Sequence, residues 1–345
     1  MTDTAFVAIG RNEGERLRRC LQSIHRVSSR VVYVDSGSTD GSQEFARSLG
    51  SEVVALDTSQ GFTMARARNA GWRQLIALWP DAHSIHFIDG DCELIDGWLD
   101  TATNFLADNP GVAAVCGRRR ERYPEASVFN RLCETEWNTP TGEVDACGGD
   151  ALFRREALES LGGFDELLIA GEEPELCLRM RLSGWKIFRI DADMTRHDAN
   201  ITRLKQWWRR CVRGGYGAAD VAHRTADRPG GPLFAGQVRS AVRWTFTMTT
   251  AATLGIMASL FSGAFLSPAV GLGIGIFGFS AIGGVIFLQA FRIAAKNRER
   301  ASGWRYAAEY GLWTLGAKLP QTLGVLRHRS DVRARRTAKI IEYKQ

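Results

Sequence analysis

The chain has 345 residues, of which 45% are hydrophobic and 24% are charged, and its formal net charge is +6. This length suggests one large or two ordinary domains, and the composition excludes a disordered or collagen-like chain. The charge is unevenly distributed, because residues 244–291 contain no Asp, Glu, Lys or Arg, whereas residues 292–345 contain 13 Lys and Arg against four Asp and Glu. A basic excess after an apolar run is typical of a membrane protein's cytoplasmic tail, so nucleic-acid binding is the weaker interpretation.

Seven cysteines are scattered along the chain, and none of them forms a Cys-x-x-Cys pair. Such a set argues against a disulfide framework or a zinc site and suits a reducing cytosol. The sequence passes from Met1 directly into an apolar stretch without a signal-peptide pattern. We therefore expect the first domain to stay in the cytoplasm.

The first hundred residues alternate between short apolar segments and helical patterns. This alternation predicts βαβ units and an α/β fold with a mainly parallel central sheet, in which ligands bind beyond the carboxyl ends of the strands. The predicted strands are residues 6–10, 31–35, 53–56 and 84–88, and the predicted helices are residues 13–24, a segment ending at 49, and 62–79. Polar residues gather at the strand ends, as Arg11-Asn12-Glu13, Asp35-Ser36-Gly37 and Asp89-Gly90-Asp91.

Two membrane segments are predicted in the uncharged run, at residues 244–262 and 269–291, because 48 uncharged residues are about twice the ~20 needed for one crossing. Basic residues flank the run on both sides, and the positive-inside rule puts both flanks in the cytoplasm. We therefore expect a multi-pass helical hairpin in the inner (cytoplasmic) membrane. Residues 303–326 are amphipathic and carry three charges, which predicts an interfacial helix rather than a third span.

These patterns predict four regions. They are an α/β domain at residues 1–225, a linker or juxtamembrane segment at 226–243, two transmembrane helices within 244–291, and a basic cytoplasmic amphipathic tail at 292–345.

Asp89 and Asp91 stand at a predicted strand end and are separated by one glycine. Two carboxylates at this spacing can face one divalent cation, Mg²⁺ or Mn²⁺, which in turn can hold a diphosphate. Asp-Gly-Asp is also a good turn sequence, so the triplet alone is a weak signal. Its position at the ligand-binding edge of an α/β sheet favours the metal-site interpretation.

Asp35 follows four apolar residues and precedes a polar loop. A carboxylate there can accept hydrogen bonds from a base or a ribose, and Gly37 allows close approach of the backbone. The loop also turns the chain and caps the next helix. We expect Ser38 and Asp40 to provide that cap, which would leave the Asp35 carboxylate free.

Taken together, these motifs resemble family 2 glycosyltransferases with the GT-A fold, over residues 5 to about 215. The order of the motifs carries the resemblance. In the first half they are AIGRNE, VDSGSTDGS, ARARNAG and FIDGDCEL, and in the second half GGDALFRREALESLGGFDE, GEEPELCLRMRLSGWKI and RHD. The fused hairpin resembles exopolysaccharide-type members that act on polyprenyl-linked acceptors at the inner leaflet.

The resemblance implies a nucleotide-sugar donor and assigns roles to several residues. Asn12, Glu13 and Asp35 would contact the nucleoside, with Asp35 as the base contact. Arg68 would approach the diphosphate, where a charged fork suits phosphate. Asp89 would orient the ribose or the sugar.

The resemblance further implies a divalent cation, Mg²⁺ or Mn²⁺, with Asp91 as a ligand. His197 is a candidate further ligand, because several GT-A enzymes have a histidine near this position. A lone histidine is more often structural, and that alternative stays open. The GEEPEL stretch matches the element that opens a helix near the acceptor.

An inverting transfer needs a base that takes the proton of the acceptor hydroxyl. The aligned position is Glu173, where the family more often has Asp, and Glu172 stays an alternative. Two adjacent acids at a helix start are otherwise ordinary complements of the helix dipole.

The element from Gln206 to Arg210 partly resembles the Gln-x-x-Arg-Trp element of processive synthases, although a plain interfacial aromatic and basic helix is preferred. The predicted function is therefore metal-dependent, inverting transfer of a single sugar, from a UDP-sugar in preference, to a lipid-linked or other membrane-proximal acceptor. One alternative is a processive polysaccharide synthase, and another is a catalytically silent nucleotide-sugar-binding scaffold subunit. Homo-oligomerisation stays open. An NAD-binding Rossmann enzyme is disfavoured, because no Gly-x-Gly-x-x-Gly turn follows the first strand.

Overall fold

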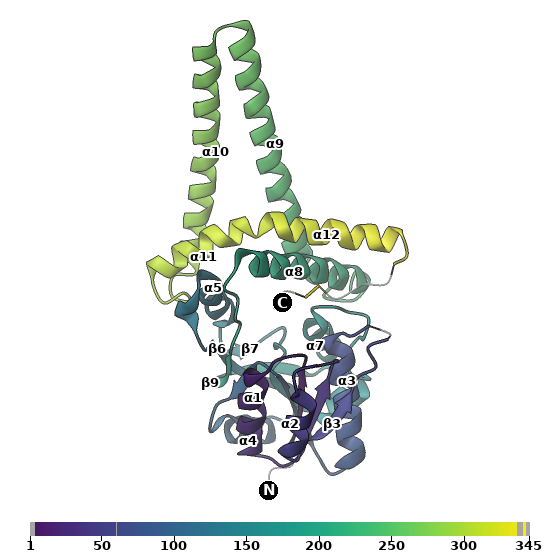
Figure 1. The fold of residues 1–345 in the computed structure, drawn as a ribbon. Coiled ribbons are helices and arrows are strands. Elements are labelled where there is room, and N and C mark those ends of the chain that lie inside the picture. The colour runs from purple at the N-terminus through teal and green to yellow at the C-terminus, as the bar shows by residue number, and fades with distance from the viewer. Residues whose placement is uncertain (1–3, 60, 337–340, 343–345) are drawn as a thin grey trace.

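The computed structural model describes residues 4–59, 61–336 and 341–342. An α/β domain forms one end of the molecule, and two long helices extend from it as a hairpin (Figure 1). Among the described residues, nine strands form one sheet in the order β3-β2-β1-β4-β8-β6-β9-β5, with β7 paired to β9. The strands are β1 (Thr4–Gly10), β2 (Val31–Asp35), β3 (Glu52–Ala55), β4 (Ser84–Asp89), β5 (Cys92–Leu94), β6 (Val112–Glu121), β7 (Gly142–Glu143), β8 (Ala151–Arg154) and β9 (Lys186–His197).

The helices of the α/β domain connect these strands and cover the sheet. For example, α3 packs on β1 and β2, while α4 packs on β6 and β9. They are α1 (Glu15–His25), α2 (Ser42–Ser48), α3 (Met64–Leu78), α4 (Trp98–Asp108), the short 3₁₀ helix η1 (Pro124–Ala126), α5 (Val128–Trp137), α6 (Arg155–Ser160) and α7 (Glu172–Leu182). The predicted strands and helices of the first hundred residues are all present, with ends that differ by a few residues.

The first half of the sheet is parallel and buried, as the apolar runs predict. Strand β1 pairs in parallel with β2 on one side and with β4 on the other, and β2 pairs in parallel with β3. Every residue of β2 is buried, since helices cover both faces of a parallel sheet. The chain order reverses between β1 and β4, which creates the topological switch point where ligands bind in such sheets.

The register of the sheet brings the polar strand ends to one edge. Ile9 is the Cα partner of Asp89, and Gly10 is the partner of Asp35. The segments that follow β1, β2 and β4 therefore meet beyond the same edge. The second half of the sheet is mixed, because β8 runs antiparallel to both β4 and β6.

Helices α9 (Ala235–Phe265) and α10 (Pro268–Lys296) form the hairpin. Both are long and apolar enough to cross a membrane, and 6% of the most apolar window of each is buried. The two helices are therefore candidates for membrane spans by length and composition, and their apolar side chains are exposed rather than packed in a core. Helix α9 begins at Ala235, so half of the segment expected as a linker at 226–243 is helical.

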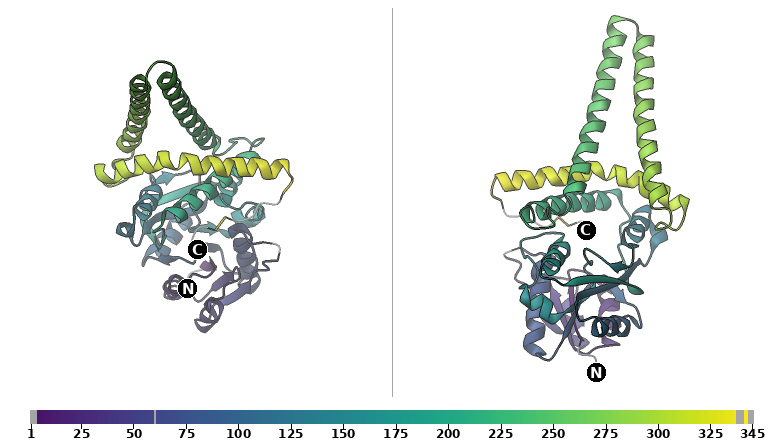
Figure 2. Two further views of the ribbon diagram at one scale, coloured as in Figure 1. Left: turned by 45° about the horizontal axis from the view of Figure 1, so that its top comes forward. Right: turned by 180° about the vertical axis from the view of Figure 1, so that it is seen from behind.

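Three helices lie between the hairpin and the sheet, and we call them the platform helices (Figures 1 and 2). They are α8 (Leu204–Arg224), α11 (Trp304–Gly316) and α12 (Lys318–Arg333). The single helix expected over residues 303–326 is wrong, because the helix breaks at Ala317. Pro320 has no N–H to donate to the Gly316 carbonyl, so the first helix cannot continue through it.

Candidate functional site

One cavity of about 760 Å³ lies between the carboxyl ends of the central strands and the platform helices. Its lining includes seven of the nine site residues predicted from the sequence. They are Asn12, Glu13, Arg68, Asp89, Asp91, Glu173 and His197. Asp35 and Glu172 lie behind its wall, and both side chains are fully buried. Most of the predicted site residues therefore line one cavity at the switch point of the sheet. The roles of these residues stay predictions.

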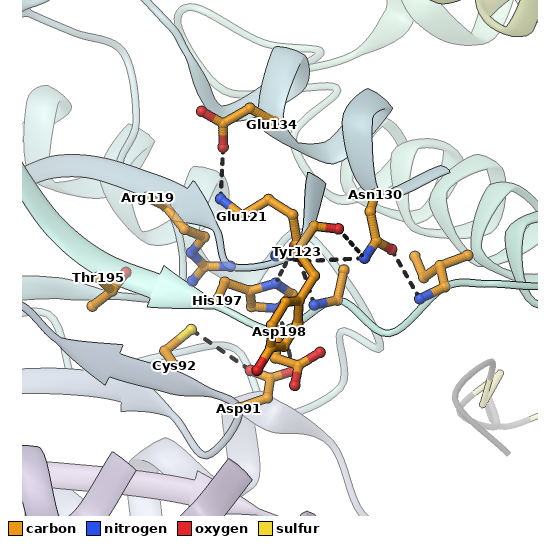
Figure 3. A network of polar contacts seen from close by, with 12 residues as sticks. Asp91, Cys92, Arg119, Glu121, Tyr123, Asn130, Glu134, Thr195, His197 and Asp198 are labelled. Atoms are coloured by element: carbon orange, nitrogen blue, oxygen red, sulfur yellow. Dashed lines mark hydrogen bonds and ion pairs between the residues drawn. The ribbon is translucent and has the colours of Figure 1, made fainter. Parts of the chain in front are cut away.

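Asp91 and His197 are brought together by strand pairing. Strands β5 and β9 are antiparallel, with Cys92 opposite His197, so Asp91 at the end of the tight turn lies beside the imidazole. The distance from Asp91 Oδ2 to His197 Nε2 is 3.2 Å. The side chains of Asp91, Cys92 and His197 offer ligand atoms within 4.8 Å of one another (Figure 3). The Cys92 thiol donates to Asp91 Oδ1 at 3.6 Å, which ties it to the carboxylate.

A second carboxylate supports His197 from behind. Glu121, at the end of β6, places Oε2 at 3.5 Å from His197 Nδ1 (Figure 3). The side chain of Trp137 packs edge-on against the imidazole, with ring centroids 4.6 Å apart. A carboxylate on one ring nitrogen orients the other nitrogen toward the cavity, as in metal sites whose histidine ligands are fixed by an outer carboxylate. Sequence reasoning missed Glu121, which is 76 residues away from His197.

Arg68 lies under the cavity floor as the centre of a buried ion-pair network. Its side chain is 1% exposed. The guanidinium contacts Asp89 Oδ1 at 2.8 Å, Glu172 Oε1 at 2.6 Å and Glu173 Oε1 at 2.9 Å. A buried guanidinium with several carboxylate partners positions those carboxylates, because breaking any pair would leave an uncompensated charge in low dielectric. The resemblance implied that Arg68 approaches the diphosphate, and in the structure its guanidinium is already paired with three carboxylates.

The two adjacent glutamates at the start of α7 have different surroundings. Glu172 is fully buried, whereas Glu173 keeps 13% of its side chain exposed and lines the cavity. Burial and the neighbouring charge of Glu172 raise the pKa of Glu173, Arg68 opposes both, and the net result is a pKa of about 7. A carboxyl with a pKa near neutrality that faces a cavity is suited to take up a proton. Glu173 is therefore the better placed of the two candidates for a base.

A second arginine holds the other side of Asp89. Arg119 Nη2 lies 3.3 Å from Asp89 Oδ2 and 3.0 Å from Asp150 Oδ1, and Asp150 Oδ1 also accepts from the Asp89 backbone N–H at 2.9 Å. A Cβ on Gly149 would lie 2.5 Å from Arg68 Nη2, so only glycine fits there. Sequence reasoning missed Arg119 and Asp150. The Gly-Gly-Asp motif was the available signal, but its partner Asp89 is about 60 residues away.

The Asp35 carboxylate is not free, contrary to the expectation from the sequence. It accepts hydrogen bonds from the Tyr33 hydroxyl at 2.9 Å, from the Gly37 and Ser38 backbone N–H groups at 3.0 and 2.9 Å, and from Gln43 Nε2 at 2.9 Å. Ser38 does not cap α2, because its hydroxyl instead accepts from the Asn12 backbone N–H. The Asp35 carboxylate therefore stabilises the conformation of the loop that follows β2.

Asn12 connects the first two loops at the edge of the sheet. Its side-chain Oδ1 accepts from the Thr39 backbone N–H at 2.8 Å, and it adopts a left-handed conformation with φ of 52°. Glu13 forms an ion pair at 2.8 Å with Arg16, in the first turn of α1. These contacts hold the loop after β1 against the loop after β2, and so form one rim of the cavity.

The platform helices provide the opposite wall of the cavity. That wall is aromatic and basic, in contrast to the acidic floor. It includes Trp207, Arg210, Arg213, Tyr310, Trp313 and Lys318, and Gln237 of α9 lines the same end of the cavity. Trp207 and Trp313 pack edge to face with centroids 4.8 Å apart, and Arg210 forms an ion pair with Glu136 at 2.7 Å.

Comparison with known proteins finds similarity to glycosyltransferases. Residues 7–162 match the family described as Glycosyl transferase family 2. The pre-mycofactocin glycosyltransferase of Mycobacterium tuberculosis is 28% identical over 272 residues, which cover 75% of this chain and 55% of that protein. The succinoglycan biosynthesis protein ExoA of Rhizobium meliloti is 30% identical over 188 residues, covering 51% and 55% of the two chains. The chain thus spans about half the length of these relatives.

A solved structure shares the fold. The mannosyltransferase PcManGT from Pyrobaculum calidifontis, in complex with GDP-Man and Mn²⁺, superposes with a TM-score of 0.56 at 17% identity. The match covers 94% of this chain and 87% of that one. At this identity the likeness establishes the fold, which is GT-A followed by helices.

Proposed function

This chain belongs to glycosyltransferase family 2, and from that premise we propose that it transfers a single sugar, with inversion, from a nucleoside-diphosphate sugar to a lipid-linked or other membrane-proximal acceptor. A UDP-sugar is the favoured donor. The observation that carries the proposal is the shared cavity, in which Glu173 faces the same space as the Asp91–His197 pair. A base and a diphosphate site must flank one anomeric carbon for such a transfer.

The residues around Asp91 fit a divalent cation. Asp91 supplies a carboxylate oxygen and His197 an imidazole nitrogen that Glu121 orients. This donor set suits Mn²⁺ better than Mg²⁺, because Mg²⁺ prefers oxygen ligands. When bound there, the cation would neutralise charge on the leaving diphosphate. Asn12 and Glu13 line the cavity beside this pair and would contact the nucleoside.

The transfer itself is a direct displacement. Glu173 would accept the proton of the acceptor hydroxyl as that oxygen attacks the anomeric carbon, and the bond from this carbon to the diphosphate would break. Arg68 would hold Glu173 and Asp89 in place through its ion pairs. Because Glu173 has a raised pKa, it binds the proton more readily than an ordinary carboxylate and releases it again near neutral pH.

The exposed apolar surfaces support a membrane-proximal acceptor. The hairpin is apolar and exposed, and basic residues flank both of its ends. In α12, Leu319, Leu323 and Leu326 follow a helical spacing and are 43–44% exposed. We infer that the hairpin crosses the cytoplasmic membrane and that α11 and α12 lie in its cytoplasmic interface, with the α/β domain in the cytoplasm.

Calorimetric titration of the full chain in detergent with UDP, GDP and other nucleoside diphosphates, with and without Mn²⁺, tests the donor site. We expect one nucleotide to bind only with Mn²⁺, and Asp91→Asn to abolish that binding. Asp96→Asn, at an exposed carboxylate outside the cavity, is the matched control and should bind normally. Absence of binding by every nucleotide would overturn the proposal. Product length in a subsequent transfer assay separates single-sugar from processive transfer.

A further inference from the structure

The cavity joins two chemically different ends of the molecule. Its floor carries Asp89, Asp91 and Glu173, at the edge of the sheet. Its opposite end reaches Gln237, in the first turn of the hairpin helix α9, and Lys318, at the start of α12. A ligand that filled this cavity would extend from these three carboxylates to the platform helices, from which the hairpin rises. Figure 1 shows this arrangement of the platform helices and the hairpin.

Lys318 differs from the other cations of the cavity in its surroundings. Arg68 and Arg119 each have carboxylate partners, and Arg210 has Glu136. Within the described ranges, no carboxylate lies within ion-pair distance of the Lys318 ammonium. Its side chain is half-buried, and burial lowers its pKa. A partly desolvated cation without a counter-ion is costly, and binding of an anion would remove that cost.

The position of Lys318 is fixed by tight helix packing. A Cβ on Gly215 of α8 or on Gly324 of α12 would collide with the backbone of the other helix. These close contacts hold α12 against α8, so that Lys318 faces the cavity beside Arg210 and Arg213 of α8. The Trp207–Trp313 pair forms the adjacent wall. Cationic and aromatic side chains at the base of a membrane hairpin are suited to a phosphate whose remaining substituents are a sugar and an acyl or prenyl chain.

We propose that the platform end of the cavity, centred on Lys318, binds the phosphate group of a lipid-linked acceptor. This inference rests on the proposed function and assigns the acceptor a binding site. The lipid chain would leave the cavity along the base of the hairpin beside Gln237. The group attached to the phosphate would extend down the cavity, where its hydroxyl reaches Glu173.

The test measures acceptor binding without donor. The full chain is placed in phosphatidylcholine nanodiscs that contain undecaprenyl phosphate, and saturation is followed by tryptophan fluorescence. We expect saturable binding of undecaprenyl phosphate and none of undecaprenol. Lys318→Gln should weaken binding about tenfold, because the charge-assisted hydrogen bond to the phosphate is lost. Lys205→Gln, at an exposed lysine of α8 outside the cavity, is the matched control and should bind as the unmodified chain does.

Several outcomes would overturn the inference. Equal affinity of Lys318→Gln and Lys205→Gln would show that Lys318 does not contact the phosphate. Binding of inorganic phosphate as tight as that of the lipid would show that a soluble anion, not a lipid, is the ligand. If Lys318→Gln lost Mn²⁺-dependent nucleotide binding, the lysine would belong to the donor site.

The two proposals fail separately. Nucleotide binding without lipid-phosphate binding would overturn the acceptor site and leave the donor site standing. Lipid-phosphate binding without nucleotide binding would overturn the donor site and leave the acceptor site standing.

Discussion

The cavity floor and the apolar hairpin differ in where they place charged and apolar side chains. In the floor, Arg68 is buried and the Arg119 side chain is 16% exposed, and each of them contacts at least two carboxylates. In the hairpin, by contrast, residues 244–291 contain no charge, and large apolar side chains such as Phe261 and Phe277 are 64% and 76% exposed.

This difference indicates the surroundings in which each region is stable. Buried charges are tolerated when paired, so the floor keeps ionised groups ready at a site that is partly shielded from water. Exposed apolar helices are tolerated when the solvent is lipid, and their backbone groups are satisfied within each helix. The platform helices lie between these regions and combine basic, aromatic and apolar side chains.

Replacing Glu173, the proposed base, should have the largest effect on the transfer rate. It removes one charge from the cavity floor. In Glu173→Gln we expect transfer to fall by about 10²–10⁴-fold, the usual contribution of general base catalysis, with Mn²⁺-dependent nucleotide binding retained. Initial rates with a radiolabelled donor give the first quantity and calorimetry gives the second. Glu159→Gln, at an exposed glutamate of α6, is the control and should retain the full rate. Retention of more than a tenth of the rate in Glu173→Gln would exclude it as the base.

Adding a methyl group to the hairpin tests the apolar region and should have an intermediate effect. A Cβ on Gly271 would lie 2.5 Å from the Ser259 carbonyl oxygen of the facing helix, whereas a Cβ on Gly273 would meet open space. We expect Gly271→Ala to destabilise the hairpin by about 1–3 kcal/mol, the usual cost of overpacking. Gly273→Ala, its matched control, should be neutral or slightly stabilising. Equal melting temperatures for the two variants in nanodiscs would contradict the observed pairing of α9 with α10.

Removing the charge of Glu172, the buried neighbour of Glu173, should have the smallest effect on the rate. This variant tests whether charges in the cavity floor set the pKa of Glu173. Glu173 must be ionised to accept a proton, so transfer should rise with pH through its pKa of about 7. Glu172 carries a like charge that raises this pKa, and Glu172→Gln therefore lowers it. We expect the acid limb of the pH–rate profile to move to lower pH in Glu172→Gln. An unchanged limb, or a shift to higher pH, would show that Glu172 does not act on Glu173.

Much of the fold could be predicted from local patterns. Apolar runs bounded by polar turns predicted β1, β2, β3 and β4, and the uncharged run of 48 residues predicted the hairpin. Asp89 and Asp91 could be named as candidates because their position at a strand end depends only on neighbouring residues. Such features depend on short-range periodicity and on the chemistry of turns, both of which are visible in a single sequence.

The partners of these residues could not be predicted. His197 stands beside Asp91 because β9 pairs with β5, and Glu121 reaches the same imidazole from β6. Sequence spacing could not distinguish Glu172 from Glu173, since which glutamate faces the cavity depends on how α7 packs. The expectation that Asp35 is free failed for a related reason, because the Gln43 and Tyr33 side chains turn onto it only in the folded loop.

The sequence by itself thus determined the order of strands and helices in the first ninety residues, the apolar hairpin and the family motifs. These features depend on the intrinsic preferences of residues close together in the chain. Only the tertiary structure decided which acids pair with Arg68, which glutamate remains accessible, and that Lys318 shares a cavity with Asp91 although 227 positions separate them. Burial and pairing of charge are long-range properties, because the dielectric surroundings of a side chain are set by segments distant in sequence.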